Sequence, residues 1–145
     1  MMPEVDINEN PLIRELDSLN LPAVDFALFG SAPLLAWGVR DRINDLDLIA
    51  RGGAWNKAKR LGHLSPAPSG NGCVVHLAGG LIEIFDRWVD SSWDTNKLID
   101  SADVFSGFKF VKIEMVYRWK NSSNRSKDQH DAAAMRRLLD CGQDK

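Results

Sequence analysis

The chain has 145 residues, of which 44% are hydrophobic and 26% charged, and this balance excludes an intrinsically disordered protein. Its length predicts one domain spanning residues 1–145. The formal net charge of -2 argues against a protein that coats DNA, because phosphate neutralisation needs many spare lysines and arginines. Two cysteines are too few for a disulfide framework, and no apolar run approaches the ~20 residues that cross a bilayer, so we expect a cytoplasmic protein with no membrane partner.

The N-terminal part of the chain predicts a helix followed by a buried strand. Asn10 before Pro11 is typical of an N-cap and a first helical residue, and the apolar stripe that follows stops before Pro22. Residues 23–29 are mostly apolar and end at Gly30, which favours a buried strand that leads into a turn.

The next segments predict a second helix, a second strand and a third helix. Ser31 is a suitable cap for a helix that Gly38 ends. Residues 45–50 alternate with period two and predict a strand, and residues 55–61 predict a short helix. Residues 62–72 are rich in Gly, Pro and Ser, so we expect a loop without regular structure.

A hairpin and a short helix are expected in the middle of the chain. Two β-prone runs, 73–77 and 81–85, flank the turn 78–80. Residues 95–99 favour at least one helical turn before a polar connection, and residues 111–119 predict a helix.

The C-terminal part predicts a further helix with a capping box formed by Ser126 and Gln129 and an end at Gly142. Together the elements predict an α/β (α+β) fold, with a mixed sheet flanked by helices and helices at the C-terminus. The sequence contains no internal repeat.

Three acidic residues form the main candidate site. Alternate residues of a strand point the same way, so Asp45 and Asp47 should share one face, with Cα atoms roughly 6–7 Å apart. Glu83, on another predicted strand, is the best third acid, and Asp86 is its competitor. The alternative is an ordinary half-exposed strand whose acids face water.

Such a group of carboxylates favours divalent cations. Acids this close repel one another unless cations lie between them. Hard oxygen ligands suit magnesium, and two-metal phosphoryl-transfer sites hold their ions ~3.5–4 Å apart. The pattern is therefore consistent with displacement at phosphorus. Trp88 and Trp93 follow the third acid and either stack on a base or pack in the core.

The turn at Gly30 and Ser31 is a candidate phosphate site. It lies where a predicted strand passes into a helix, and there the free backbone N–H groups and the helix dipole favour phosphate. A small residue lets phosphate approach the backbone. The alternative is an ordinary strand-to-helix turn.

These two segments together resemble a known signature. A hydrophobic strand, Gly-Ser, a helix and then acid-hydrophobic-acid on the next strand are similar to the signature of the DNA polymerase beta-type nucleotidyltransferase superfamily. The likeness is closest to its small bacterial members: the minimal nucleotidyltransferases, the AbiEii-type toxins and the small antibiotic-modifying enzymes.

The resemblance extends over residues 26–139. Arg42 precedes the acid pair by three positions as in those proteins, and Lys120 with the run Arg125-Ser126-Lys127-Asp128 is similar to their later basic motif. Two departures are the third acid, which is Glu rather than the commoner Asp, and Pro33 within the signature helix.

The resemblance implies a magnesium-dependent enzyme that moves a nucleoside monophosphate from a nucleoside triphosphate to a hydroxyl of an RNA, a protein or a small molecule. The implied ligands of the two magnesium ions, which are also the implied catalytic residues, are Asp45, Asp47 and Glu83. The implied nucleotide-binding residues are Gly30, Ser31, Arg42, Lys120, Arg125 and Lys127. The alternative is a catalytically inactive nucleotide- or partner-binding module with the same fold, one half of a toxin–antitoxin pair with an antitoxin-like protein partner. A basic surface at the end of a helix is the alternative for Lys120, Arg125 and Lys127.

Overall fold

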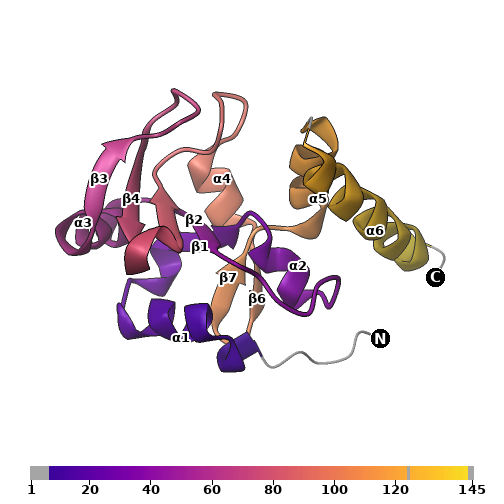
Figure 1. The fold of residues 1–145 in the computed structure, drawn as a ribbon, viewed down its shortest axis with the longest axis horizontal. Helices are drawn as coiled ribbons and strands as arrows, with labels where there is room; N and C mark the ends of the chain where they lie inside the picture. The colour runs from indigo at the N-terminus through magenta and orange to yellow at the C-terminus, as the bar shows by residue number, and fades with distance from the viewer. Residues whose placement is uncertain (1–6, 124, 144–145) are drawn as a thin grey trace.

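The chain forms one mixed β-sheet with helices on both faces (Figure 1), in a computed structural model that describes residues 7–123 and 125–143. The strands are β1 (Phe26–Phe29), β2 (Leu46–Ala50), β3 (His63–Pro66), β4 (Cys73–Leu77), β5 (Ile82–Phe85), β6 (Asp103–Phe105) and β7 (Phe108–Phe110). The α-helices are α1 (Pro11–Ser18), α2 (Ala32–Ala36), α3 (Gly52–Leu61), α4 (Thr95–Asp100), α5 (Ile113–Ser122) and α6 (Ser126–Gln143). This confirms the predicted α/β class with a mixed sheet and C-terminal helices.

The strand order of the sheet is β3-β4-β5-β2-β1-β7-β6. At its centre β2 runs antiparallel to β1 and parallel to β5. The register pairs Phe29 with Asp47, and Asp47 in turn with Glu83. Three strands that are separate in the sequence therefore bring the Gly30 turn and two of the acids to neighbouring positions.

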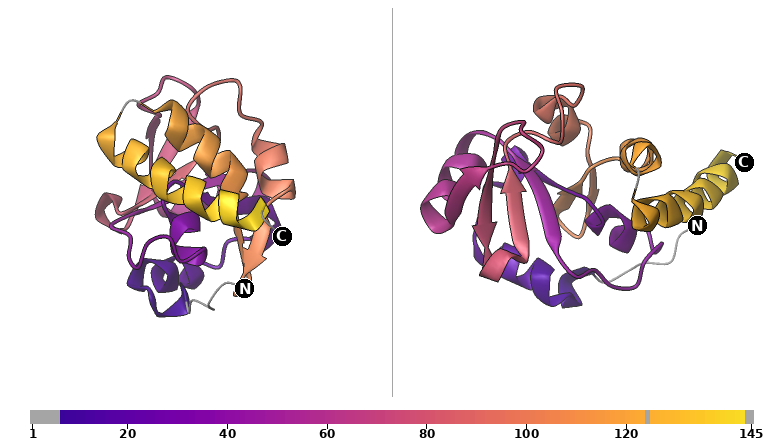
Figure 2. Two further views of the ribbon diagram at one scale, coloured as in Figure 1. Left: turned by 90° about the vertical axis from the view of Figure 1, so that its right-hand side faces the viewer. Right: turned by 45° about the horizontal axis from the view of Figure 1, so that its top comes forward.

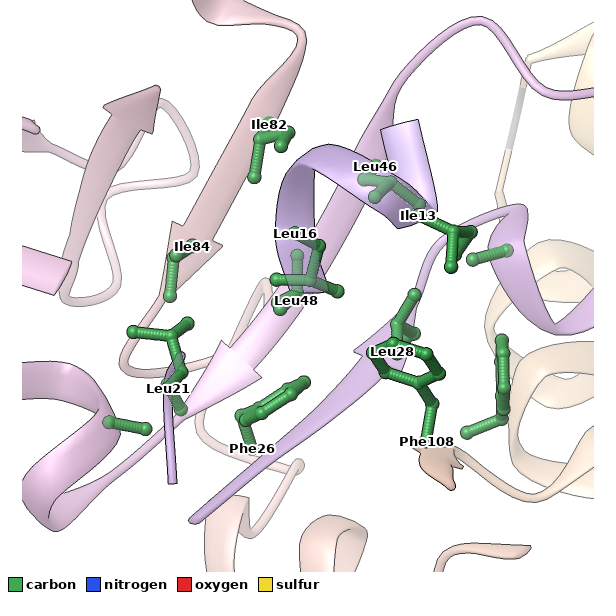
Figure 3. Packing of buried hydrophobic residues seen from close by; sticks show 14 of the residues in the cluster. Ile13, Leu16, Leu21, Phe26, Leu28, Leu46, Leu48, Ile82, Ile84 and Phe108 are labelled. Atoms are coloured by element: carbon green, nitrogen blue, oxygen red, sulfur yellow. The ribbon is translucent and has the colours of Figure 1, made fainter. Parts of the chain in front are cut away.

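One face of the sheet is an apolar layer under α1 (Figure 3). Alternate residues of each strand enter it, so the residues between them point to the other face. Figure 3 shows, from α1, β2 and β5, the side chains of Ile13, Leu16, Leu46, Leu48, Ile82 and Ile84. Burial of these leucines and isoleucines sets which face Asp47 and Glu83 occupy.

The opposite face holds a second apolar cluster that joins the sheet to the C-terminal helices. Phe29 and Ile49 contribute from the strands, Ile99 from α4, Val116 from α5 and Met135 from α6. The helices α5 and α6 pack side by side at one end of the molecule, as both Figure 1 and Figure 2 show. No helix within the described ranges is both long enough and apolar enough to span a membrane.

Several sequence predictions are confirmed. Asn10 caps α1, since its Oδ1 accepts hydrogen bonds from the backbone N–H groups of Leu12 (2.9 Å) and Ile13 (3.3 Å). The strands β4 and β5 form the expected antiparallel hairpin. The helices α2, α4 and α5 lie where they were predicted, with ends shifted by a few residues.

The prediction of a loop over residues 62–72 is wrong, because β3 lies within it. This strand sits at the edge of the sheet and most of its residues are exposed, so no buried face imposes an apolar alternation on it. The strands β6 and β7 were also missed. Each has three residues, which are too few to show an alternation of apolar and polar side chains. In addition, β7 pairs with β1, from which it is far separated in the sequence.

The predicted capping box of the last helix is also wrong, and the helix ends one residue later than predicted. The first helical bond of α6 runs from the Gln129 N–H to the Arg125 carbonyl (3.1 Å), and the Gln129 side chain donates to the Ser123 carbonyl (2.6 Å). It therefore ties α6 to the end of α5 rather than to Ser126. The helix continues through Gly142 to Gln143.

Candidate functional site

The Gly30 turn lies directly against Asp47. Gly30 has a φ of +61°, a left-handed conformation that residues with a side chain rarely adopt. A Cβ atom at this position would lie 2.6 Å from Oδ2 of Asp47. Glycine is thus needed for both its backbone angle and its size, and the candidate phosphate turn is in contact with a candidate metal ligand.

Asp47 and Glu83 are neighbours on parallel strands, and both line the same cleft. Asp45 lies one residue before β2, and its side chain is exposed. Asp86 is engaged elsewhere, since its Oδ1 accepts the backbone N–H of Cys73 at 2.8 Å. Between the two competing third acids, the structure brings Glu83 and not Asp86 to Asp47.

The environment of Asp47 disfavours its charge. The pKa of Asp47 is raised from 3.8 to about 7, chiefly by burial and then by the neighbouring carboxylates of Asp45 and Glu83, against opposing effects of Lys120 and Lys127. A cation beside these acids would remove the repulsion. The charge pattern therefore has the sign that a divalent metal site requires.

The three acids are not yet a closed metal-binding group. Over residues 7–123 and 125–143, no set of three or more His, Cys, Asp or Glu side chains is already gathered to hold an ion. The donor chemistry nevertheless fits a hard divalent cation, because the site offers adjacent carboxylate oxygens and no sulfur. The Asp47–Glu83 pair forms the centre of the candidate metal site. Asp45 is exposed and close enough to raise the pKa of Asp47.

Lys120 is a fully buried cation at the turn. Its Nζ donates to Ser31 Oγ (3.3 Å), Asp128 Oδ1 (3.1 Å) and Asp131 Oδ2 (3.1 Å). Burial by itself would raise the pKa of Asp128, but hydrogen bonds from Arg125, Ser123 and Lys120 outweigh it and hold that pKa below its usual value. The network fixes the C-terminal helices against the Gly30 turn.

Ser31 participates in this network instead of capping α2. No side-chain capping bond is present at Ser31, and its Oγ lies within reach of Lys120 and, at 3.5 Å, of Arg40. Arg40 also lies 3.7 Å from Asp131. The hydroxyl of Ser31 therefore lies between two cations, each of which is also paired with a carboxylate of α6.

The other predicted basic residues differ in their surroundings. Arg125 pairs with Asp128 through two hydrogen bonds of 2.8 and 3.1 Å. Arg42 and Lys127 are exposed, and Lys127 is close enough to lower the pKa of Asp47. Lys127 therefore has more spare charge for a ligand than Arg125 has.

A cleft of about 330 Å³ runs from the acids to the C-terminal helices. Asp47 and Glu83 line one side, and Trp119, Ser123, Arg125 and Asp128 line the other. Trp88 also lines it, but this ring is only 4% exposed and stacks on Phe29 at 4.1 Å, so it belongs to the core. Trp93 packs against the second apolar cluster, and the guanidinium of Arg118 lies over its ring, 4.4 Å from the ring centre. Two half-buried aromatic rings, those of Trp119 and Phe85, thus line the cleft beside the acids.

Comparisons with protein-family models, curated proteins and solved structures gave no match to this chain.

Sequence reasoning missed four residues of this site. Arg40 and Asp131 belong to the Ser31 network, and Asp131 could have been found from its spacing, since Asp128 and Asp131 are three apart on one helix. Trp119 lines the cleft, and His76 contacts Glu83. No local pattern marks Trp119 or His76, because each meets the acids only through tertiary packing or cross-strand register.

Proposed function

We propose that the protein is a magnesium-dependent nucleotidyltransferase, which moves a nucleoside monophosphate from a nucleoside triphosphate to an acceptor hydroxyl. The observation that carries the proposal is the close approach of Gly30 to Asp47, which is paired in register with Glu83. A phosphate turn and an acidic pair must adjoin if both contact one triphosphate. The resemblance to the DNA polymerase beta-type superfamily supports the same conclusion.

The residues have distinct roles in this proposal. Asp45, Asp47 and Glu83 would hold the magnesium ions, which neutralise phosphate charge and lower the pKa of the acceptor hydroxyl. The backbone N–H groups of the Gly30–Ser31 turn bind the β- and γ-phosphates. Glu83 accepts the hydroxyl proton as the acceptor oxygen bonds to the α-phosphorus and the bond to pyrophosphate breaks.

The basic residues act at different distances from the nucleotide. Lys127 and Arg42 are exposed and supply charge that is not already paired in the described contacts. Lys120 supports the turn from beneath, through Ser31. Such transfer depends on positioning and electrostatic stabilisation more than on covalent chemistry by the protein.

A second candidate is an inactive nucleotide- or partner-binding module, including one half of a toxin–antitoxin pair. The observation that favours it is that Lys120 and Arg125 are already paired with carboxylates. Lys120 pairs with Asp128 and Asp131, and Arg125 also pairs with Asp128. Less positive charge is then left for a triphosphate. Pro33 favours neither candidate, because it lies in the first turn of α2, where a proline is tolerated.

The test is magnesium-dependent nucleotide binding, measured by isothermal titration with each of four non-hydrolysable nucleoside triphosphates. Asp47→Asn removes a charge at the centre of the site, and Asp17→Asn makes the same change on an exposed position of α1. We expect binding that requires magnesium, a loss of at least tenfold in Asp47→Asn, and no change in Asp17→Asn. Binding that is indifferent to both magnesium and Asp47 would refute the proposal.

A second measurement separates enzyme from inactive module. Pyrophosphate release is followed with RNA 3′ ends, proteins and small hydroxyl compounds as acceptors. Release that disappears in Asp45→Ala/Asp47→Ala supports the transferase. Magnesium-dependent binding without release for any acceptor class supports the module.

A further inference from the structure

A row of three polar side chains crosses the sheet next to the acids. His76 on β4 is paired in register with Glu83 on β5, and its Nδ1 lies 3.1 Å from Glu83 Oε2. On its other side, His76 Nε2 lies 3.0 Å from the Oγ of Ser65 on β3. The row Ser65–His76–Glu83 thus ends at the carboxylate that neighbours Asp47.

The chemistry of the groups sets the direction of these bonds. An ionised carboxylate can only accept, so Nδ1 of His76 carries the hydrogen that is donated to Glu83. In the neutral ring Nε2 is then the acceptor, and Ser65 Oγ–H donates to it. The contact uses Oε2 of Glu83, and among the described residues no hydrogen bond or ion pair engages Oε1, which can therefore meet a ligand.

Neither Ser65 nor His76 reaches the cleft. Glu83 and Asp47 are among the described residues that line it, whereas Ser65 and His76 are not. Both His76 and Glu83 are only partly exposed, with 32% and 29% of their side chains accessible. Any effect of Ser65 or His76 on a ligand in the cleft must therefore pass through Glu83.

We propose that His76, itself oriented by Ser65, is a positioning residue that fixes the Glu83 carboxylate beside Asp47 for a divalent cation. Glutamate has one more rotatable bond than aspartate, so a carboxylate at this distance from the backbone needs an anchor to keep one orientation. Hydrogen-bond partners behind metal ligands have this effect, and their loss typically lowers metal affinity by about 10–100-fold. The inference rests on the proposed function, because it assigns Glu83 to the metal.

The test uses Mn²⁺ as the probe, with free Mn²⁺ measured by electron paramagnetic resonance on the full chain. His76→Asn and His76→Gln form a matched pair: the amide nitrogen of Asn replaces Nδ1 and retains the bond to Glu83, whereas that of Gln replaces Nε2 and loses it. We expect His76→Gln to weaken Mn²⁺ binding about 10–100-fold and His76→Asn to stay within about threefold of the wild type. Ser65→Ala should fall between them.

A second readout does not depend on the metal. The ¹⁵N resonances of His76 in the wild type should show one tautomer, with the hydrogen on Nδ1, and Ser65→Ala should shift the Nε2 resonance. Circular dichroism identifies any variant that fails to fold. If a His76 variant does not fold, the positioning role is tested by Mn²⁺ binding in Ser65→Ala and by the ¹⁵N resonances of His76 in the wild type.

The outcomes separate the two proposals. A wild type that does not bind Mn²⁺ overturns the metal-dependent function, and the positioning role with it. A wild type that binds Mn²⁺, with equal affinity in folded His76→Gln and His76→Asn, overturns the positioning role alone. Rapid exchange between tautomers of His76 also counts against the row, because it shows that the ring is not held.

Discussion

Asp47→Asn should make the protein more stable at neutral and alkaline pH. The folded environment raises the pKa of Asp47 from 3.8 to about 7, a shift of about three units, and each unit corresponds to ~1.36 kcal/mol. Ionising Asp47 in the folded protein therefore costs roughly 4 kcal/mol at most. Partial access to solvent reduces this, so we expect roughly 2–4 kcal/mol.

The raised pKa sets the pH window of the effect. Between pH 4 and 7 the folded protein holds a proton on Asp47 that the unfolded chain has released, so the free energy of unfolding falls as pH rises. Above pH 7 both states are ionised and the cost stays constant. Asparagine has nearly the same size and no charge, so its gain should be small near pH 4 and full at pH 8.

Urea unfolding of the wild type and Asp47→Asn at pH 4.5, 6 and 8 measures this difference directly. Thermal unfolding at pH 8 should show the same difference as a rise in Tm of roughly 5–15 °C. Asp17→Asn, on an exposed position, controls for a general change in charge. A loss of stability in Asp47→Asn at pH 8, or an equal gain at pH 4.5 and 8, would show that Asp47 is not held in a charge-disfavouring site.

Two further substitutions test the turn and the buried lysine. Gly30→Ala should lose roughly 2–4 kcal/mol, because it combines a left-handed φ with a Cβ 2.6 Å from Asp47 Oδ2. Gly70→Ala, with a φ of +84° and no atom within 4 Å, should lose only about 1–2 kcal/mol, and equal losses in urea unfolding would contradict the close approach. Lys120→Met should lose about 3–5 kcal/mol, because it leaves two buried carboxylates without their shared cation. Lys112→Met breaks an exposed ion pair of similar length and should lose less than about 1 kcal/mol; comparable Tm losses in both variants would refute the role assigned to burial.

The sequence by itself determined the parts of this protein that depend on neighbouring residues. The Asn10 cap, the β4–β5 hairpin and the inward leucines of β2 follow from local hydrogen bonds and from the alternation of a strand. The same alternation places Asp47 on the face opposite Leu46 and Leu48. Local chemistry was also sufficient to select the Gly30 turn.

Only the tertiary structure decided how these parts meet. The parallel pairing of β2 with β5 joins residues more than thirty positions apart and selects Glu83 over Asp86, and no local pattern encodes that register. Packing of α5 and α6 against the turn buries Lys120 among carboxylates, where the sequence had suggested a free cation for phosphate. Long-range contacts carry these outcomes because the free energy of pairing and burial depends on which segments come together, whereas a sequence window reports only its own propensity.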